Sequence, residues 1–234
     1  MYYNNSCYNC YFNFNHRYFF RNFFWIKKKQ NGGSIIVKYV SKENDKVIDL
    51  FNKGNLDEKD YEIKLISNNT LPIRDLSGNN IDQNIFLATK EGTYEFEIKL
   101  KKIITSMEGM FKNKPELKSA DFSKLVSKKI INMKNLFSNC TNLEAVNFNN
   151  FDAKKLETMD NCFENCSNIV VLDLNSFITP KLKSMNSAFN GCTNLIFLDI
   201  KNFIIDSNVN INNFIDVVNL WIMLNIQVIV IIMI

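Results

Sequence analysis

The side chains best suited to chemistry in this sequence are its six cysteines. Cys140, Cys166 and Cys192 recur every 26 residues, whereas Cys7 and Cys10 form a single C-x-x-C without a second pair. A disulfide needs Cα atoms within about 7 Å, but cysteines on neighbouring packed helices would be about 8–10 Å apart. One C-x-x-C does not complete a zinc site unaided. We therefore predict buried free thiols in the repeats and no metal site.

The histidines and charged residues argue against catalysis and nucleic-acid binding. The single histidine is His16, which is too few for a Ser/His/Asp triad or a multi-histidine metal site in the folded body. The formal net charge is +4, but five positive charges lie within residues 1–31 without any acid, which leaves −1 for the rest. Binding to phosphates depends on an excess of basic side chains. We predict a protein that is not an enzyme, uses no cofactor and does not bind nucleic acid.

From residue 104 onward the sequence repeats with a period of 26 residues, which is typical of stacked structural units. The clearest columns are the methionines and phenylalanines Met107, Met133, Met159, Met185, Phe111, Phe137, Phe163 and Phe189. A single unit cannot bury its apolar face alone, so neighbouring units must stack. The expected core of the repeats is Met133, Phe137, Cys140, Leu143, Met159, Phe163, Cys166, Ile169, Met185, Phe189, Cys192 and Leu195.

Each repeat combines two hydrophobic spacings. Apolar residues at i, i+3, i+7 and i+10 predict one face of a short helix, as at Leu182, Met185, Phe189 and Cys192. The L-x-x-L-x-L spacing that follows is typical of a leucine-rich-repeat strand, as at Leu195, Leu198 and Ile200. The predicted fold class is therefore an α/β solenoid, in which a leucine-rich-repeat-like parallel sheet is accompanied by short helices.

The residues at both ends of the expected helix agree with this interpretation. The N-cap would be the polar side chain immediately before each methionine, at Ser106, Asn132, Thr158 and Ser184. The C-terminal end would be closed by residue types that tolerate a left-handed backbone, at Asn113, Asn139, Asn165 and Gly191. Caps at both ends of one segment favour a helix there.

The sequence divides into four segments. Residues 34–103 contain alternating or β-branched runs such as YEFEIKL, separated by Gly, Asn and Pro, and predict a small β-rich or α+β domain that caps the first repeat. Residues 1–31 form an aromatic and basic leader that lacks the charge order of a signal peptide. Four repeats occupy residues 104–207. Residues 208–234 are either a degenerate fifth repeat or an apolar anchor.

The two interpretations of the tail rest on different features. Adding 26 to the apolar columns gives apolar residues again, and it places Trp221 beneath Leu195 and Leu224 beneath Leu198. This agreement favours a fifth repeat. Residues 217–234 also contain no charge and are long enough to span a membrane, so this is where we expect any membrane contact.

The repeats resemble a known family of surface proteins. The segments INMKNLFSNCTNLEAVNFNNFD, ETMDNCFENCSNIVVLDLNSF and KSMNSAFNGCTNLIFLDIKNF share the pattern M-x-x-x-F-x-x-C-x-x-L-x-x-L-x-L-x-x-F. This pattern is similar to the 26-residue repeat of BspA-type leucine-rich-repeat surface proteins, which include mycoplasma lipoproteins. The resemblance covers residues 104–206 and implies a non-enzymatic binding or adhesion module that is displayed on a cell surface or secreted.

The outward positions of the strands are the expected binding surface, because such a sheet presents its non-core residues on one open face. The predicted partner-binding residues are Asn147, Val170, Val171, Asp173, Ile196, Phe197 and Asp199. A face without a converging cleft suits a protein or another macromolecule better than a small substrate. The alternative is that these apolar residues only satisfy strand propensity or lie under the tail.

Two functional interpretations stay open from the sequence. The resemblance implies a protein-interaction or adhesion module at the cell surface. The missing signal peptide and the unpaired thiols instead favour an intracellular scaffold built from the same repeats. Cell fractionation combined with surface proteolysis would distinguish the two.

Overall fold

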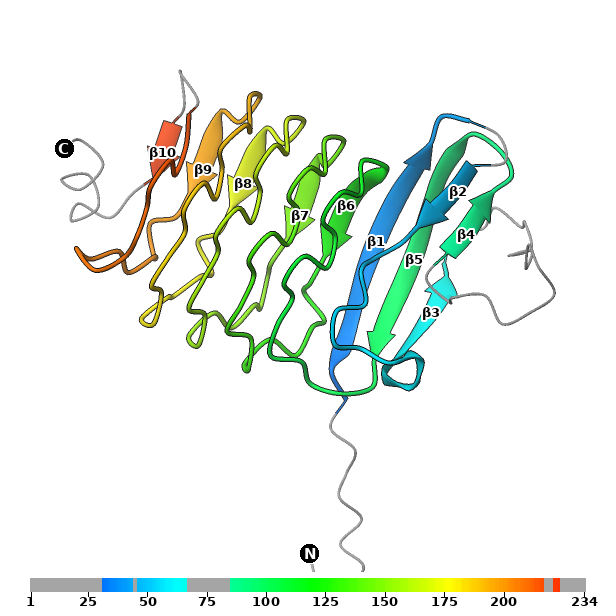
Figure 1. Cartoon of the computed structure of the whole chain (residues 1–234), viewed down its shortest axis with the longest axis horizontal. Coiled ribbons are helices and arrows are strands. Elements are labelled where there is room, and N and C mark those ends of the chain that lie inside the picture. Colours follow the sequence, from blue (N-terminus) through cyan, green and yellow to red (C-terminus); the bar gives the residue numbers. More distant parts are fainter. Residues whose placement is uncertain (1–30, 44–45, 67–84, 217–220, 224–234) are drawn as a thin grey trace, which may run out of the picture.

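The structure is a computed structural model that describes residues 31–43, 46–66, 85–216 and 221–223. Strands make up almost all of the regular structure in this part of the chain (Figure 1). In chain order they are β1 (Gly33–Ser41), β2 (Lys46–Asp49), β3 (Tyr61–Leu65), β4 (Ile85–Ala88), β5 (Gly92–Leu100), β6 (Leu117–Asp121), β7 (Ala145–Asn147), β8 (Val171–Asp173), β9 (Phe197–Asp199) and β10 (Trp221–Met223). The sequence-stretch calls on Cys7, Cys10 and His16 lie outside the described residues.

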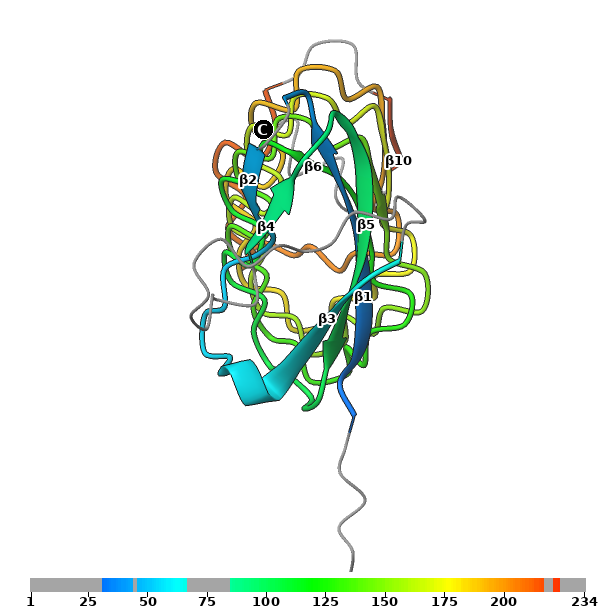
Figure 2. The same ribbon diagram turned by 90° about the vertical axis from the view of Figure 1, so that its right-hand side faces the viewer.

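The N-terminal strands and the first repeats share one sheet. In β1 the alternate residues Ile35, Val37 and Tyr39 are fully buried, as expected for a strand with one face on the core. β1 pairs antiparallel with β5 on one side and with β6 on the other, and β6 pairs parallel with β7. The order of this five-stranded sheet is β3-β5-β1-β6-β7. Figure 2 views the molecule from the end that these N-terminal strands cover.

The predicted fold class, an α/β solenoid with one leucine-rich-repeat-like parallel sheet and short helices, is wrong. Within the described residues the only helical element is a 3-10 turn, η1 (Glu58–Asp60), and it lies outside the repeats. The sheets are mixed and separate. The five-stranded sheet ends at β7, β8 to β10 form a second sheet, and β2 and β4 form a third. The molecule is β-rich, and the segments expected as helices are runs of turns.

A second left-handed residue in each repeat prevents the expected helix. The predicted left-handed column is present, with φ of 63° at Asn139 and 74° at Gly191. Four residues earlier, a further column also has positive φ: Asn135 (56°), Asn161 (54°) and Ser187 (50°). These residues follow the methionines by two positions, inside the segment expected to be helical. A right-handed helix does not continue through a left-handed residue.

Backbone groups in these segments bond to the neighbouring repeat instead of to a helical turn. Alternate N–H groups donate across repeats over 2.8–3.0 Å, in the pairs Met133–Thr158, Asn135–Asp160, Phe137–Cys162 and Asn139–Glu164. The N–H groups between them close turns within their own repeat, as from Cys140 to the Phe137 carbonyl. The residues expected as N-caps form isolated parallel bridges between repeats, such as Asn132 with Thr158. Each repeat is therefore held in register by its neighbours.

Phenylalanine rings stack along the length of the repeats. Phe163 lies between Phe137 and Phe189, with ring centroids 5.3 Å and 5.6 Å away. A second column stacks Phe177 on its neighbours in the adjacent repeats in the same way. All of the residues expected in the repeat core are fully buried: Met133, Phe137, Cys140, Leu143, Met159, Phe163, Cys166, Ile169, Met185, Phe189, Cys192 and Leu195. The 26-residue period thus produces continuous columns of buried side chains.

The tail follows the repeat register only in part. Asn210 forms a parallel bridge with Ser184, which keeps the 26-residue spacing. β10 then pairs parallel with β9, but Trp221 is opposite Phe197 and not opposite Leu195 as the offset predicted. The chain therefore reaches this strand two residues early. No helix within the described ranges is long and apolar enough to cross a membrane; residues 224–234 lie outside those ranges.

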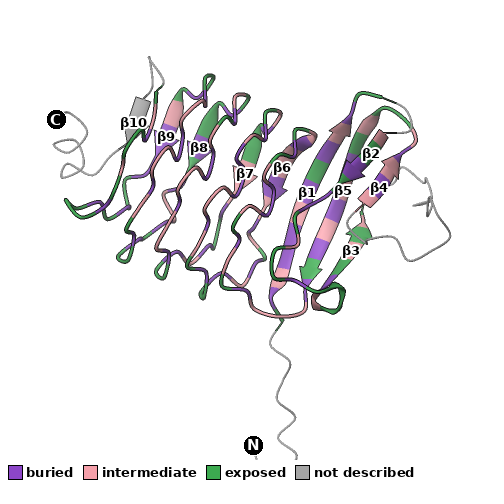
Figure 3. Cartoon of the chain, in the orientation of Figure 1, coloured by how far each residue is buried: buried purple, intermediate pink, exposed green. Residues whose placement is uncertain are grey.

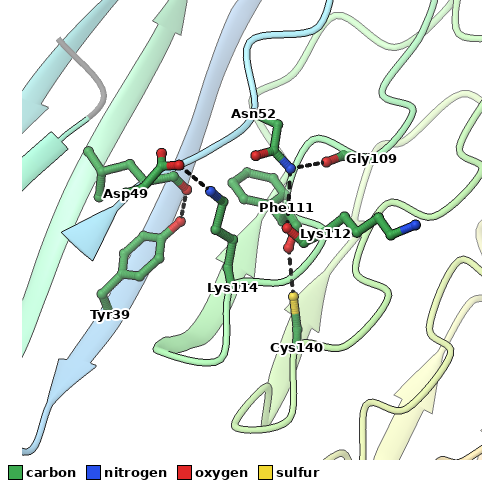
Figure 4. A network of polar contacts seen from close by, with 9 residues as sticks. Tyr39, Asp49, Asn52, Gly109, Phe111, Lys112, Lys114 and Cys140 are labelled. Atoms are coloured by element: carbon green, nitrogen blue, oxygen red, sulfur yellow. Dashed lines mark hydrogen bonds and ion pairs between the residues drawn. The ribbon is translucent and has the colours of Figure 1, made fainter. Parts of the chain in front are cut away.

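The first repeat has a lysine where the others have the recurring cysteine, and the N-terminal strands explain the difference (Figure 4). Lys114 is buried, and its Nζ lies 2.6 Å from Oδ2 of Asp49 at the end of β2. Nearby, Asn52 Nδ2 donates to the carbonyl of Gly109 at 2.6 Å. These contacts attach the segment after β2 to the first repeat, so Lys114 replaces a core thiol with an ion pair to the N-terminal strands.

Candidate functional site

Exposed aliphatic side chains gather on β8 and β9. Leu172 and Leu198 are fully buried, so the residues beside them in each strand point outward. Val170, Val171 and Ile196 are 43%, 52% and 53% exposed. Phe197 is half-buried and lies opposite Val171 in the parallel pairing of β8 with β9. We call Val170, Val171, Ile196 and Phe197 the apolar face; Figure 3 shows the exposed upper parts of these strands.

The apolar face is a property of the later repeats. At the positions equivalent to Val170 and Ile196, the first two repeats carry Lys118 and Glu144, whose charged groups are 3.3 Å apart. Ala145 takes the position of Val171 on β7 and offers little apolar area. The face therefore changes from charged to aliphatic between β7 and β8, where the two sheets also separate.

The predicted row of Asn147, Asp173 and Asp199 has a structural role at the strand ends. In each, the Oδ1 oxygen accepts the backbone N–H two residues later, over 2.9 Å for Asn147, 2.9 Å for Asp173 and 3.1 Å for Asp199. Side-chain to backbone bonds of this kind stabilise the turn that follows a strand. The signal in the sequence was the repeated position of a short Asn or Asp directly after the strand.

The three members of this row differ in their access to a partner. Asp199 is only 5% exposed, and its Oδ2 lies 3.2 Å from Nζ of Lys201. Asp173 is exposed and has no cationic neighbour of this kind among the described residues, and Asn147 is half-buried. The structure therefore brings Val170, Val171, Ile196, Phe197 and Asp173 to one open surface and places Asp199 largely beneath it. Sequence reasoning missed Lys201 as the partner of Asp199.

The repeat cysteines are buried, as predicted. Each thiol donates to the carbonyl of the phenylalanine in the preceding repeat: Cys140 to Phe111 (2.9 Å), Cys166 to Phe137 (3.2 Å) and Cys192 to Phe163 (3.1 Å). Burial raises the pKa of Cys140 and of Cys192 from 9.0 to about 12. The described residues contain no group of three or more potential metal ligands. These thiols act as core side chains and not as nucleophiles.

Thiol labelling of the native protein at pH 8 should therefore be at least about 100-fold slower than in denaturant for Cys140, Cys166 and Cys192. Because the folded state retains these protons to higher pH than the unfolded chain, the free energy of unfolding should fall as the pH rises from 9.0 toward 12. Mass spectrometry after a short pulse of a maleimide measures the first effect. Rapid native labelling at these three positions would contradict the buried assignment.

A cleft of about 360 Å³ lies between residues 52–56 and residues 102–110. Its charged groups are engaged by the fold. Lys102 Nζ is 2.5 Å from Asp60 Oδ2, and Glu108 accepts a hydrogen bond from Asn132 Nδ2 at 2.9 Å. The cleft is therefore a weaker candidate site than the open face on β8 and β9.

Comparison with known proteins places the repeats in a family. Residues 99–219 match the family described as Mycoplasma protein of unknown function, DUF285, and the match covers just over half of the chain. The chain belongs to this family. In this DUF285 protein the match begins within β5 and extends past β9, so it includes the apolar face. No curated protein and no solved structure is significantly similar to this DUF285 chain.

Proposed function

We propose that the protein is a non-enzymatic interaction or adhesion module that binds a macromolecular partner, foremost a protein, on the apolar face. The observation that carries this proposal is the exposure of Val170, Val171 and Ile196 side by side on β8 and β9. Adjacent aliphatic side chains that stay in contact with water are typical of interaction surfaces. Burying them against a partner would release the free energy that their exposure costs.

The surroundings of the apolar face fit a protein partner. Phe197 is half-buried in the same surface and offers an aromatic anchor of the kind that concentrates binding energy. Asp173 lies exposed beside it at the end of β8 and would orient a basic group of the partner. The inter-repeat hydrogen bonds hold the face in place, so binding would order few additional residues.

The finer assignment is also a proposal: we infer that the chain is a surface protein of the BspA type. The shared pattern M-x-x-x-F-x-x-C-x-x-L-x-x-L-x-L-x-x-F supports it, as does membership of a mycoplasma family. An intracellular scaffold would use the same face. Surface proteolysis of intact cells distinguishes them, because only a displayed chain is cleaved without lysis.

Removing the apolar side chains should abolish partner binding. We expect the double substitution Val171→Ser with Ile196→Ser to reduce the amount of captured partner at least about tenfold, because two exposed anchors of the interface are lost. The measurement is chemical cross-linking of the full chain to cell-surface or host proteins, followed by quantitative mass spectrometry of each captured protein.

The matched control is Val47→Ser with Ile66→Ser, since these aliphatic residues of the N-terminal part are 49% and 40% exposed. A partner that is captured by the wild-type chain and the control, but not by the Val171/Ile196 variant, supports the proposal. If every captured protein is retained equally by both double variants, the apolar face is not the binding surface.

A further inference from the structure

The lower turns of the repeats carry a line of lysines. In successive repeats a four-residue turn is closed by a backbone bond from Ile130 to Ser127, from Leu156 to Ala153 and from Leu182 to Thr179. These turns lie along the lower edge of the repeats in Figure 1, and their tips are exposed in Figure 3. Their central positions are occupied by Lys128, Lys129, Lys154, Lys155 and Lys181, which we call the lysine ridge.

The charges of the lysine ridge are not neutralised by the fold. All five side chains are exposed, and none lies within ion-pair distance of an acid among the described residues. Lys183, two residues after the ridge, shows the contrast, since its Nζ is 2.7 Å from Glu157. The nearest acid in sequence, Asp152, uses Oδ1 to accept the backbone N–H of Lys154 at 3.1 Å.

The turns that carry the ridge are fixed relative to one another. Ser127 Oγ accepts the N–H of Asp152 at 2.7 Å, and Thr179 Oγ1 accepts the N–H of Ile204 at 3.1 Å. Neighbouring repeats bonded in this way are spaced by about 4.8 Å, as in a sheet. Like charges held at such spacing repel one another, and an array of anions brought against them would relieve the repulsion. The opposite turns of the repeats carry Asn, Ser and Thr at the same level, so the charge belongs to this edge alone within the last three described repeats.

Exposed isoleucines flank the lysine ridge. Ile131 follows the first turn and is 41% exposed, while Ile178 and Ile204 precede the later turns and are each 48% exposed. Lysines beside aliphatic side chains suit a lipid interface, where ammonium groups meet phosphates and apolar groups enter between the headgroups. A single-stranded nucleic acid would instead need exposed aromatic rings for stacking, and the large exposed apolar residues in the described ranges are all aliphatic.

We propose that the lysine ridge docks the repeats on the surface of a bilayer that contains anionic phospholipids. The lysines would bind the headgroup phosphates, and Ile131, Ile178 and Ile204 would enter the interface between them. This contact lies at an edge separate from the apolar face on β8 and β9. Docking on a membrane would leave that face open to a partner, and it does not depend on the proposed partner binding.

The test uses the full chain and vesicles of phosphatidylcholine with or without about one third phosphatidylglycerol. Each basic residue near an anionic surface contributes about fivefold in affinity. The substitution of Lys128, Lys129, Lys154 and Lys155 by glutamine should therefore weaken binding to the anionic vesicles by about two orders of magnitude. The matched control replaces Lys42, Lys64, Lys90 and Lys99, four exposed lysines of the N-terminal part, and changes the net charge equally.

Co-sedimentation and a dissociation constant for each variant decide the matter, with a thermal melt to verify folding. Strong binding by the wild-type chain and the control, and loss in the ridge variant, supports the proposal. Equal losses in both variants would show attraction by net charge alone and overturn it. Wild-type binding to neutral vesicles as strong as to anionic ones would overturn it as well, as would ridge-dependent binding to soluble heparin without binding to vesicles.

Discussion

Replacing Phe163 by alanine is expected to lower the free energy of unfolding by about 3–5 kcal/mol. The ring is fully buried and stacks between Phe137 and Phe189, with centroids 5.3 Å and 5.6 Å away. The neighbouring repeats are fixed by backbone bonds on both sides of the ring, so they cannot close the cavity that the substitution leaves. Urea denaturation followed by circular dichroism measures the loss.

The comparison for Phe163→Ala is Cys166→Ala in the same repeat. Cys166 is also fully buried, but its thiol is small, and removing it deletes one weak bond to the Phe137 carbonyl. We expect a loss of about 1 kcal/mol. Equal losses for the two variants would mean that the phenylalanine column does not anchor the repeats.

Gly191→Ala is expected to cost about 2–3 kcal/mol, because this glycine is required both by its backbone and by its neighbour. Its φ is +74°, a region that costs a residue with a Cβ about 1 kcal/mol. A Cβ there would also lie 2.2 Å from Oδ1 and 3.1 Å from Cα of Asn165. The Asn165 side chain cannot swing away freely, because its Nδ2 donates to Asn139 Oδ1 at 2.8 Å.

A matched glycine separates the two causes. Gly54 has a φ of +54° with nothing within 4 Å of a built Cβ, so Gly54→Ala should show the backbone cost alone, about 1 kcal/mol. In addition, Asn165→Gly should recover part of the loss in the Gly191→Ala background, which a double-mutant cycle by urea denaturation measures. If Gly191→Ala is no worse than Gly54→Ala, the repeats are not packed as closely at this point as described.

The buried columns could be predicted from the sequence, whereas the local backbone could not. A period of 26 residues with Met, Phe and Cys at fixed positions defines which side chains face inward in any stacked arrangement. The spacing from Leu182 to Cys192 suits a helix, but consecutive turns that bury one side produce the same spacing. The distinguishing signal was the pair of positions such as Asn135 and Asn139, four residues apart. Two residues that favour left-handed backbone inside one short segment argue against a helix.

The candidate surfaces could be predicted in the same uneven way. Exposure of Val170, Val171 and Ile196 follows from strand alternation beside the buried leucines. The depth of Asp199 does not, because it depends on the Lys201 contact. The lysine ridge was hidden by averaging: the body of the chain has a formal charge near zero, although the period places lysine pairs at 128–129 and 154–155 on one edge. Charge counted by repeat position, rather than over the whole chain, would have revealed it.

Site-specific photo-cross-linking tests most directly whether the apolar face binds a partner. A photoreactive amino acid is introduced in separate variants at Val171, Ile196, Lys112 and Lys183, the last two lying on the turn segments away from β8 and β9. The account predicts cross-links to the same partner from positions 171 and 196, with the controls unlinked. Cross-links confined to positions 112 and 183 would contradict it and place the binding surface on the opposite side of the repeats.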